Sequence, residues 1–354
     1  MNFFILRVMK KNRFLIIGTL VWGLLSSGIA EAGAMPLSAA SFVVLDAKSH
    51  AILYSRAPYS RRAPASTAKL LSVMVVLDHL GPNEVVRVAT AATAVQPSKL
   101  HIAAGERFYV RDLVQAMLLC SANDAAYALA IATSGTVRAF SSRMNAKARS
   151  IGARHSHFVS PAGLPAQGQY STAYDLAKIT AAAQKYPLIV QTLRKRSATI
   201  KSINGRTFAL RNTNKMLWNS GGREILGKTG YTRMAKHCFA GRIRVSNRDM
   251  LVGLMGAPKR ADLWLDLKKL AAFPPSITKP QKKNPILINR KLNNRTKVKK
   301  IQTALKRAGY FKGPVTGNFG PMTLSATKKF QAANGLQADG VVGKLTWTKL
   351  KGYL

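Results

Sequence analysis

The 354-residue sequence predicts a mixed α/β (α+β) domain followed by a smaller all-α domain. Strand-like alternation occurs near both ends of the region 41–257, whereas the residues between have mostly helical periodicity. We therefore expect one sheet assembled from N- and C-terminal strands, with a cluster of helices between them in the chain. A proline- and lysine-rich stretch then leads to a compact C-terminal unit, which indicates a linker and a second domain.

The N-terminal region has the layout of a secretory signal peptide. A basic region precedes the apolar run FLIIGTLVWGLLSSG, and the small-residue site Ala30-Glu31-Ala32 follows it. The run is short for a membrane span, so we predict that residues 1–32 are cleaved rather than kept as an anchor. The mature protein is then expected to be exported and soluble, in the periplasm or at the cell wall.

The charge is strongly positive, with 55 Lys and Arg against 13 Asp and Glu and a net charge of +42. Such a charge favours attraction to polyanions, or it is simply a solvated basic surface. The export signal and the lack of a motif with interleaved aromatics disfavour nucleic acid, which leaves anionic wall or membrane polymers as possible partners. A glycosidase needs two carboxylates facing one bond, and nothing singles out such a pair.

The cysteines, Cys120 and Cys238, leave two alternatives open. An oxidising compartment would permit a disulfide. Both residues lie in apolar segments, AMLLCSAND and KHCFAGRI, which are equally typical of buried free thiols. No group of His, Cys and Asp has the spacing of a metal site, so neither a metal nor another cofactor is predicted.

The first half of the chain predicts a hairpin and then helices. SFVVLDAKSHAILYSRAP indicates two strands around a turn at 47–50. The apolar run after Ser66 predicts a helix that Gly81 and Pro82 end. VRDLVQAMLLCSANDAAYALAIATSG has helical periodicity broken at 120–124. Further helices are expected in VRAFSSRMNAKARSIGA and STAYDLAKITAAAQKYP, the latter capped by Ser171 or Thr172.

The second half predicts strands and then a small helical unit. Strands are expected in SATIKSING, RTFALRNTN, HCFAGRIRV and DMLVGLMGA, and the amphipathic helix RADLWLDLKKLAAF closes the first domain. We assign residues 36–273 to this domain, 274–292 to a linker and 293–354 to the C-terminal domain. In the last, GNFGPMT and GVVGKLT repeat the pattern G-x-x-G-x-x-T, which indicates two glycine turns that each start a helix.

Ser66 and Lys69 are three residues apart at the start of the apolar run. A helix places such a pair on one face, so the hydroxyl and the amine can lie side by side. Burial lowers the pKa of an unpaired lysine, and a neutral amine beside a serine is a general base beside a nucleophile. S-x-x-K also occurs at 276–279 and 325–328, so this pattern alone is not specific.

Two more motifs follow in a fixed order. S-x-N occurs at 121–123, at the predicted helix break, and K-T-G occurs once, at 228–230, beside strand-like sequence. S-x-N also occurs at 202–204 and is weak by itself. The three motifs together are typical of class A β-lactamases and penicillin-binding proteins.

Longer segments extend this likeness. PASTAK, CSANDAAYALA, FVSPAGLPAQGQYSTAYDLAK, LRNTNKML and ILGKTGYT resemble the D-alanyl-D-alanine carboxypeptidases, which are low-molecular-mass penicillin-binding proteins of the serine peptidase type. The resemblance runs from about Ser41 to Phe273 and implies a penicillin-binding-protein/β-lactamase-like fold, an antiparallel sheet with a helical cluster. Ala122 replaces the glycine of the usual S-G-N and is expected to tighten that turn. Neither the frequent additional all-β domain nor a C-terminal amphipathic membrane anchor is expected.

Residues 297–354 resemble the helical peptidoglycan-binding module of many wall enzymes, which implies binding to peptidoglycan. Thr316 stands where that module often has an aspartate. The positions that match its pattern are Gly317, Phe319, Gly320, Thr323, Phe330, Gln331, Gly335, Leu336, Asp339, Gly340, Gly343, Thr346 and Trp347.

The resemblance implies a serine-type carboxypeptidase that removes the terminal D-alanine from peptidoglycan stem peptides. Ser66 is expected to form the acyl-enzyme, and β-lactam antibiotics are expected to be covalent inhibitors. Lys69 takes the proton of Ser66, helped by the nearby charge of Lys228. Ser121 passes a proton between Lys69 and the leaving amine.

The expected substrate-binding residues are Asn123, Lys228, Thr229, Gly230 and Tyr231. Asn123 is expected to hold the substrate's amide, and Lys228 and Thr229 suit the terminal carboxylate through charge and a hydroxyl donor. The backbone N–H groups of Ser66 and Tyr231 are expected to form the oxyanion hole.

Three alternatives remain. A class A β-lactamase would carry a deacylating glutamate between the second and third motifs, where Glu224 is the only glutamate and lacks that context. A D,D-endopeptidase uses the same residues on a longer leaving group. A non-catalytic wall-binding protein is disfavoured by the intact motifs. We interpret His157, Asp175 and Trp347 as structural.

Overall fold

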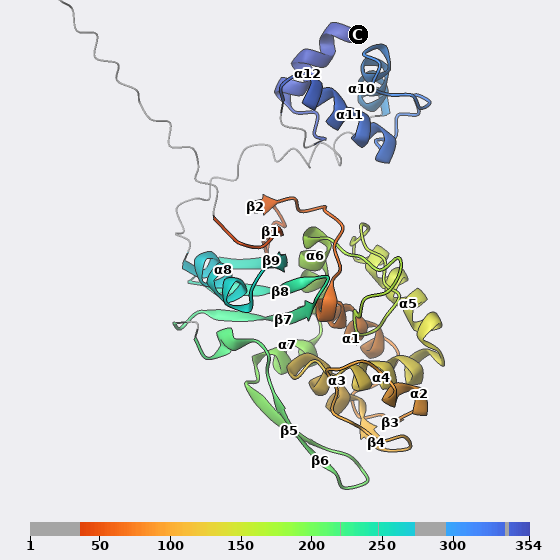
Figure 1. Ribbon diagram of the computed structural model, residues 1–354, viewed down its shortest axis with the longest axis vertical. Coiled ribbons are helices and arrows are strands. Elements are labelled where there is room, and N and C mark those ends of the chain that lie inside the picture. The colour runs from red at the N-terminus through yellow and green to blue at the C-terminus, as the bar shows by residue number, and fades with distance from the viewer. Residues whose placement is uncertain (1–35, 220, 247, 273–294, 337–339) are drawn as a thin grey trace, which may run out of the picture. The chain divides into compact units, whose positions relative to one another are not determined.

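The computed structural model describes residues 36–272, except 220 and 247, and residues 295–354, except 337–339 (Figure 1). The predicted signal peptide (1–32) and the predicted linker (274–292) lie outside the described residues, and so does Phe273. None of the described helices has the length and apolar character needed to cross a membrane.

A five-stranded antiparallel sheet with the order β2-β1-β9-β8-β7 forms the centre of the larger domain (Figure 1). Its N-terminal strands form a hairpin and its C-terminal strands a meander. β1 pairs with β9 from Ser41 opposite Met255 to Asp46 opposite Met250. This pairing confirms the predicted sheet built from both ends of the domain. The strands are β1 (Ser41–Asp46), β2 (Ile52–Arg56), β7 (Glu224–Thr232), β8 (Lys236–Val245) and β9 (Arg248–Ala257).

The helical cluster surrounds one almost wholly buried helix. This helix is α1 (Lys69–Leu77), in which every residue except Leu77 is buried, as its apolar sequence predicts. It ends four residues before the predicted stop at Gly81. The other helices of the cluster are α3 (Val110–Leu119), α4 (Asn123–Ser134), α5 (Val137–Ser150) and α6 (Ala173–Ala183).

The structure defines two predicted helix boundaries more closely. The break between α3 and α4 falls at 120–122, within the predicted interval. The cap of α6 is Thr172, whose hydroxyl accepts a hydrogen bond from the backbone N–H of Asp175 at 3.1 Å. α6 and the closing helix α8 (Arg260–Ala272) both pack on the sheet.

Two predicted strands lie outside the main sheet, and several other elements were not predicted. β5 (Ser197–Lys201) and β6 (Thr207–Arg211) are the predicted strands, but they form a separate two-stranded sheet. A second small sheet joins β3 (Val85–Arg87) to β4 (Arg107–Tyr109), near the short helix α2 (Thr90–Thr93). α7 (Pro187–Arg194) begins at Pro187, the residue before which the preceding helix is predicted to close. Proline suits the first position of a helix because its missing N–H loses no hydrogen bond there.

The described residues of the C-terminal domain, 295–336 and 340–354, form three α-helices and a 3-10 turn around their own core. Trp347 packs against that core, which supports its structural interpretation. The helices are α10 (Arg295–Arg307), α11 (Pro321–Ala333) and α12 (Lys344–Leu350), followed by η3 (Lys351–Tyr353). The buried core residues are Ile301, Ala304, Leu305, Phe311, Ala326, Phe330, Val342 and Leu350.

Two buried glutamines make the same contacts in the two repeated segments of this domain. The Gln302 side chain accepts from the Gly317 N–H at 2.8 Å and donates to the Thr323 hydroxyl at 3.0 Å. The Gln331 side chain accepts from the Gly340 N–H at 2.7 Å and donates to the Thr346 hydroxyl at 3.1 Å. The internal repeat of the sequence is therefore also a structural repeat.

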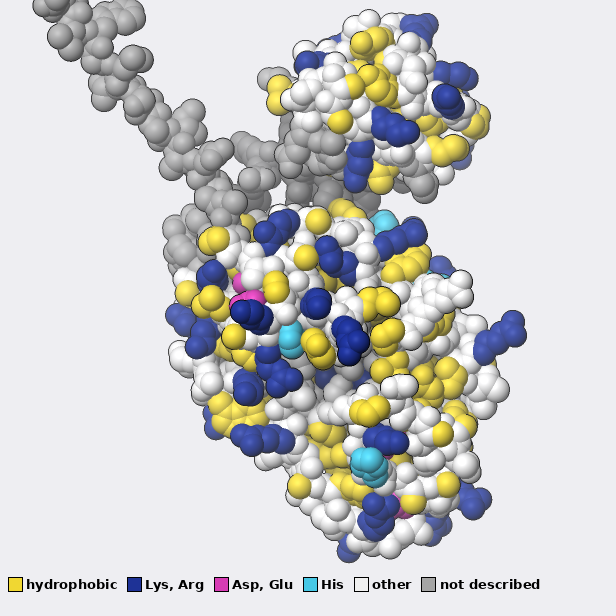
Figure 2. All heavy atoms as spheres, viewed as in Figure 1, with side chains coloured by type: hydrophobic (Ala, Val, Ile, Leu, Met, Phe, Trp, Pro, Cys, Tyr) yellow, Lys and Arg dark blue, Asp and Glu magenta, His cyan; other side chains and the backbone are white. Residues whose placement is uncertain are grey.

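The surface carries few acidic side chains. Figure 2 shows Lys and Arg over much of the visible face of both domains, with Asp and Glu in only a few places. Several of the carboxylates are already paired, among them Asp78 with Lys147 at 2.8 Å and Glu106 with Arg206 at 3.0 Å. The positive charge of the sequence is thus presented to solvent with little local neutralisation.

Candidate active site

Ser66 lies in a tight turn at the entrance to α1. The 3-10 turn η1 (Ala65–Ala68) runs directly into α1, whose first residue is Lys69. Residues three apart eclipse one another in a 3-10 turn. The Lys69 Nζ and Ser66 Oγ atoms are 2.9 Å apart, so the predicted pairing is present, in a tighter geometry than a regular helix gives.

Lys69 is fully buried and has two further oxygen partners. Its Nζ atom lies 2.6 Å from Asn123 Oδ1 and 3.1 Å from the Ala162 carbonyl oxygen. Burial and, to a smaller extent, the positive charge of Lys228 hold the pKa of Lys69 well below its usual value. A neutral amine has two N–H donors, which these two oxygens accept. Its lone pair then faces the Ser66 hydroxyl, as a general base requires.

Lys228, on β7, is the second fully buried lysine of the site. Its Nζ donates to the Thr229 carbonyl oxygen at 2.9 Å. Burial lowers the pKa of Lys228 to about 8, so the side chain stays mostly protonated at neutral pH. The lowered pKa suits Lys69 to act as a base, whereas Lys228, which stays mostly a cation, suits a carboxylate-binding group.

In the turn between α3 and α4, the residue with a strained, left-handed backbone is Ser121. Ser121 has φ +68°, whereas Ala122 has φ −54° and ψ 120°, values that any L-residue adopts. The left-handed residue of this turn is therefore Ser121, and the expectation that Ala122 tightens the turn stays a prediction. Within the described residues the Ser121 hydroxyl has no hydrogen-bond partner, which leaves it free to transfer a proton.

The Asn123 amide is used within the protein. Its Oδ1 is the partner of Lys69, and its Nδ2 donates to the Gln96 and Pro97 carbonyl oxygens at 3.0 and 2.9 Å. The sequence predicts that Asn123 holds the substrate's amide, whereas in the structure both of its N–H donors are already used within the protein. In this structure Asn123 positions Lys69 and the 96–97 segment.

The K-T-G strand passes directly against the serine turn at Gly230. A Cβ atom on Gly230 would lie 2.9 Å from the Ser66 backbone nitrogen and 3.0 Å from Ala65 Cβ, which is too close for any side chain. Gly230 therefore sets the separation between β7 and Ser66. The next residue, Tyr231, is 55% exposed and stacks on His237 with ring centroids 4.4 Å apart.

Two contributors to the site were not predicted. The Thr229 hydroxyl lies 2.7 Å from the hydroxyl of Thr213, in the quoted segment LRNTNKML, where no role was assigned. The Ala162 carbonyl is delivered by a loop in which Gly163 has φ +75°, and a Cβ on Gly163 would lie 1.9 Å from the Ala65 carbonyl oxygen. A backbone carbonyl has no sequence signature, but the glycine of SPAGLP was a usable signal.

Other residues discussed from the sequence have structural partners. The Asp175 carboxylate accepts from the His155 N–H and the Ser156 hydroxyl, both at 2.6 Å, besides lying in the first turn of α6. His157 Nδ1 lies 2.9 Å from the Gly168 carbonyl oxygen. The cysteines Cys120 and Cys238 are both free thiols.

Glu224 lies at the far end of β7 and is held by two arginines. Its carboxylate is 3.0 Å from Arg194 and 2.6 Å from Arg242. Glu224 and Gly230 are six positions apart along this strand, which is a span of about 20 Å. Glu224 is therefore not placed to activate a water molecule beside Ser66, which argues against a class A β-lactamase.

The Ser66 hydroxyl lies beside a buried lysine whose pKa is lowered, and the strand that packs against the serine turn carries a second buried lysine, which is mostly a cation. This arrangement defines an acyl-transfer enzyme with an active-site serine. The chain matches the family model of D-alanyl-D-alanine carboxypeptidase over residues 29–259 and the model of a peptidoglycan-binding domain over residues 294–350. The protein belongs to the D-alanyl-D-alanine carboxypeptidase family.

Several relatives carry related names. D-alanyl-D-alanine carboxypeptidase DacB2 of Mycobacterium tuberculosis is 34% identical over 64% of this chain and 79% of its own length. The D-alanyl-D-alanine endopeptidase of Escherichia coli is 32% identical over 67% of this chain and 77% of its own length. For DacF, a D-alanyl-D-alanine carboxypeptidase of Bacillus subtilis that is 28% identical, the match covers 66% of this chain but only 61% of the relative.

Solved structures show the same fold. A D-alanyl-D-alanine carboxypeptidase from Mycobacterium tuberculosis H37Rv superposes with a TM-score of 0.64 at 32% identity, covering 69% of this chain and 96% of that structure. The Streptomyces K15 DD-transpeptidase superposes with a TM-score of 0.62 at 26% identity, covering 66% of this chain and 95% of that structure. The penicillin-binding-protein-like fold class is therefore confirmed.

Proposed function

We propose that this protein is a serine-type D-Ala-D-Ala carboxypeptidase that removes the terminal D-alanine from peptidoglycan stem peptides. The observation that carries the proposal is the 2.9 Å contact between Lys69 Nζ and Ser66 Oγ, with both N–H groups of the amine occupied elsewhere. This geometry supports transfer of the Ser66 proton to Lys69 as the serine attacks a carbonyl carbon.

In the acylation step Ser66 Oγ bonds to the carbonyl carbon of the penultimate D-alanine, and the peptide C–N bond breaks. The proton taken by Lys69 passes through the Ser121 hydroxyl to the departing amine of D-alanine. The backbone N–H groups of Ser66 and Tyr231 stabilise the oxyanion. Water then hydrolyses the ester and releases the shortened peptide.

The terminal carboxylate of the substrate is assigned to Lys228 and Thr229. A buried cation binds a carboxylate more strongly than an exposed one because water screens it less. Thr213 holds the Thr229 hydroxyl at 2.7 Å and so orients it. Gly230 keeps this strand close enough to Ser66 for one substrate to reach both.

The remaining assignments concern location and partners. Residues 1–32 are proposed as a cleaved signal peptide, 36–273 as the catalytic domain, 274–292 as the linker and 293–354 as a peptidoglycan-binding domain. The protein then acts in the periplasm or at the cell wall, with peptidoglycan as both substrate and anchor. β-Lactam antibiotics are proposed as covalent inhibitors, and anionic wall or membrane polymers as partners of the basic surface.

A second candidate is D,D-endopeptidase activity on cross-linked peptides. The 32% identity to the Escherichia coli endopeptidase favours it, and the same residues serve both reactions. Digestion of purified monomeric and cross-linked muropeptides separates the two activities. Faster release of D-alanine from monomers identifies the carboxypeptidase, and faster conversion of dimers to monomers identifies the endopeptidase.

Intact-mass spectrometry after incubation with benzylpenicillin tests the acyl-enzyme proposal. One drug adduct on the wild type, slowly released and absent from Ser66→Ala, is the expected result. Rapid drug hydrolysis without an adduct would instead identify a β-lactamase. Neither adduct nor turnover would overturn the enzyme proposal and leave wall binding as the function.

A further inference from the structure

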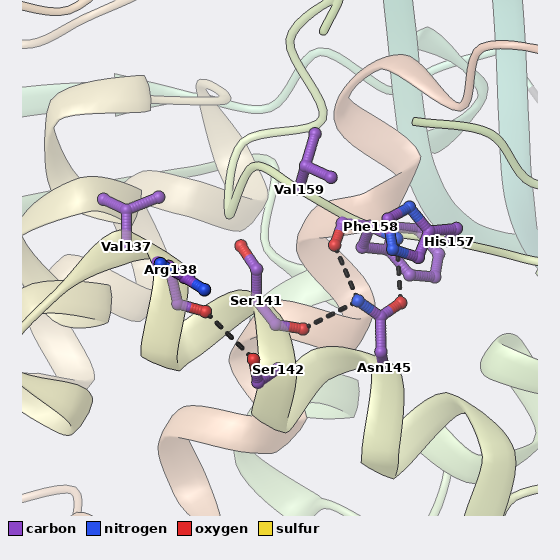
Figure 3. Close-up of a pocket in the computed structure, with 8 residues that line it drawn as sticks. All are labelled: Val137, Arg138, Ser141, Ser142, Asn145, His157, Phe158 and Val159. Carbon is purple, nitrogen blue, oxygen red and sulfur yellow. Dashed lines mark hydrogen bonds between the residues drawn. The ribbon is translucent and has the colours of Figure 1, made fainter. Parts of the chain in front are cut away.

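A cavity of about 460 Å³ opens between α5 and the segment 157–159 (Figure 3). None of the proposed catalytic or substrate-binding residues lines it. Its size is in the range of small-molecule sites. The residues that line it are Val137, Arg138, Ser141, Ser142, Asn145, His157, Phe158 and Val159.

The Ser141 hydroxyl is the first sign that this cavity is a binding site. Ser141 is only 7% exposed, and its Oγ atom is buried without a hydrogen-bond partner. In Figure 3 the Ser141 hydroxyl points into the space between Val137 and Val159. An unsatisfied buried hydroxyl is unfavourable, and a polar ligand atom that accepted from it would remove that cost.

The charged and polar lining identifies the chemistry of the ligand. Arg138 is the lysine- or arginine-type cation among the lining residues, and no carboxylate is among them. The His157 Nδ1 must donate to the Gly168 carbonyl, because a carbonyl oxygen only accepts. In the neutral imidazole Nε2 is then an acceptor, suited to an N–H group. Val137 and Val159 supply an apolar wall.

We propose that this cavity binds the C-terminal carboxylate of a short peptide. The Arg138 guanidinium pairs with the carboxylate, and the Ser141 hydroxyl donates to it as a second contact. A small apolar side chain of the peptide packs against Val137 and Val159, and a peptide N–H donates to His157. A carboxylate, an amide N–H and a small side chain occur together in a peptide C-terminus.

The wall of this cavity is connected to the candidate active site. Asn145 holds the wall through hydrogen bonds of 2.8 Å to both the N–H and the carbonyl of Phe158. Three residues after Val159, the Ala162 carbonyl accepts from Lys69. The wall of the cavity is thus three residues away from a hydrogen-bond partner of the proposed base.

Calorimetric titration of the full chain with N-acetyl-L-alanyl-L-alanine tests the binding site directly. This peptide has a free carboxylate but lacks the D-residues of the proposed substrate. We expect saturable 1:1 binding that weakens about tenfold or more when the peptide's carboxylate is replaced by an amide, as for the loss of a charge-assisted hydrogen bond. Arg138→Gln is expected to weaken binding of the acid by a similar factor.

The controls use the same helix and the other site. Arg149→Gln alters an exposed arginine of α5 outside the cavity and is expected to leave binding unchanged. Ser141→Val removes the hydroxyl donor and is expected to weaken binding. Should this variant fail to fold, Arg138→Gln, at an exposed position, still decides the question. Thr229→Ala is expected to have no effect, because it alters only the proposed catalytic cleft.

Three results would overturn the proposal: no binding, equal affinity for acid and amide, or weakening by Thr229→Ala but not by Arg138→Gln. The last result would place the peptide in the catalytic cleft. Binding is measured without turnover, so its failure leaves the penicillin experiment unaffected, and the two proposals are separately testable.

Discussion

Lys69 and Lys228 of the larger domain and Gln302 and Gln331 of the helical domain are all buried, but their surroundings differ. Each glutamine has its oxygen and its amide group hydrogen-bonded to a glycine turn and a threonine. Neither lysine has a carboxylate partner among the described residues. The pKa of each is lowered instead.

This difference separates two uses of buried polar groups. A fully hydrogen-bonded amide fixes one local structure and has no further chemistry to offer. A buried lysine without a counter-ion destabilises the fold, and the same burial makes it a base or a binding site at neutral pH. Substitutions at these positions should therefore affect the two domains in opposite ways.

The largest effect is expected from Lys69→Met. Loss of the base should slow acylation of Ser66 by benzylpenicillin by about 10²–10⁴-fold, while removal of a buried amine should raise the free energy of unfolding at pH 7. Acylation followed by mass spectrometry and thermal unfolding measure the two quantities. Lys48→Met, at an exposed turn position, is the control, and equal acylation rates for both variants would contradict a role for Lys69 as base.

Gly230→Ala should be the next most damaging. Its Cβ would lie 2.9 Å from the Ser66 nitrogen, so the strand or the serine turn must shift. A displacement near 1 Å is expected to lower the acylation rate about 10²-fold. Gly352→Ala in the helical domain, where a Cβ meets no atom within 4 Å, should change nothing. Unchanged acylation in Gly230→Ala would show that the close approach is not required.

Lys228→Met should stabilise the protein while removing its cation. The folded-state pKa of about 8 lies below the ordinary value of 10.5, so folding a protonated Lys228 costs about 3 kcal/mol. This cost is fully present below pH 8. Between pH 8 and 10.5 the folded wild type releases a proton that the unfolded chain keeps, so its stability rises with pH.

Chemical unfolding of the wild type and Lys228→Met across this pH range measures the difference. The advantage of the variant should be largest at pH 7 and disappear near pH 10.5. An advantage independent of pH would assign the gain to packing rather than to the charge.

Gln331→Leu should destabilise the helical domain by about 2 kcal/mol, because the Gly340 N–H and the Thr346 hydroxyl lose a buried partner. Hydrogen exchange of α11 and α12 in the full chain should detect the loss, and acylation of Ser66 should be unaffected. Lys329→Ala, exposed on the same helix, is the control. Equal exchange in the two variants would show that the glutamine does not hold the repeat together.

The smallest effect is expected from Ala122→Gly, which restores the usual middle motif. Because Ala122 has φ −54°, glycine relieves no strain and adds only flexibility, at about 0.5–1 kcal/mol. The acylation rate should stay within about twofold, as for a change that moves no reacting group. A tenfold change would mean that the methyl group of Ala122 shapes the site.

The sequence alone was sufficient to predict features in which the type of side chain determines the chemistry or in which a residue pattern repeats. The three motifs, the helix break at 120–124 and the two glycine turns are all evident from residue types and their spacing. The paired sheet was also predictable, because β1, β8 and β9 have the apolar character of buried strands.

The sequence was insufficient where the backbone or a distant contact decides. Which residue of the S-x-N turn is left-handed depends on how α3 and α4 pack, and in the structure that residue is Ser121. The partners of Asn123 come from the 96–97 segment, and the Ala162 oxygen belongs to the main chain. No residue type marks such contacts in advance.

The place of β1 in the sheet has a consequence for the order of events during synthesis. β1 pairs with β9, whose residues emerge about 200 positions later, and the serine turn is closed by Gly230 on β7. A growing chain therefore carries Ser66 and Lys69 long before the strand that completes their surroundings exists. Such distant pairing makes folding slow. Reactivity should appear only when the last strand is in place, so that a partly made chain cannot be acylated.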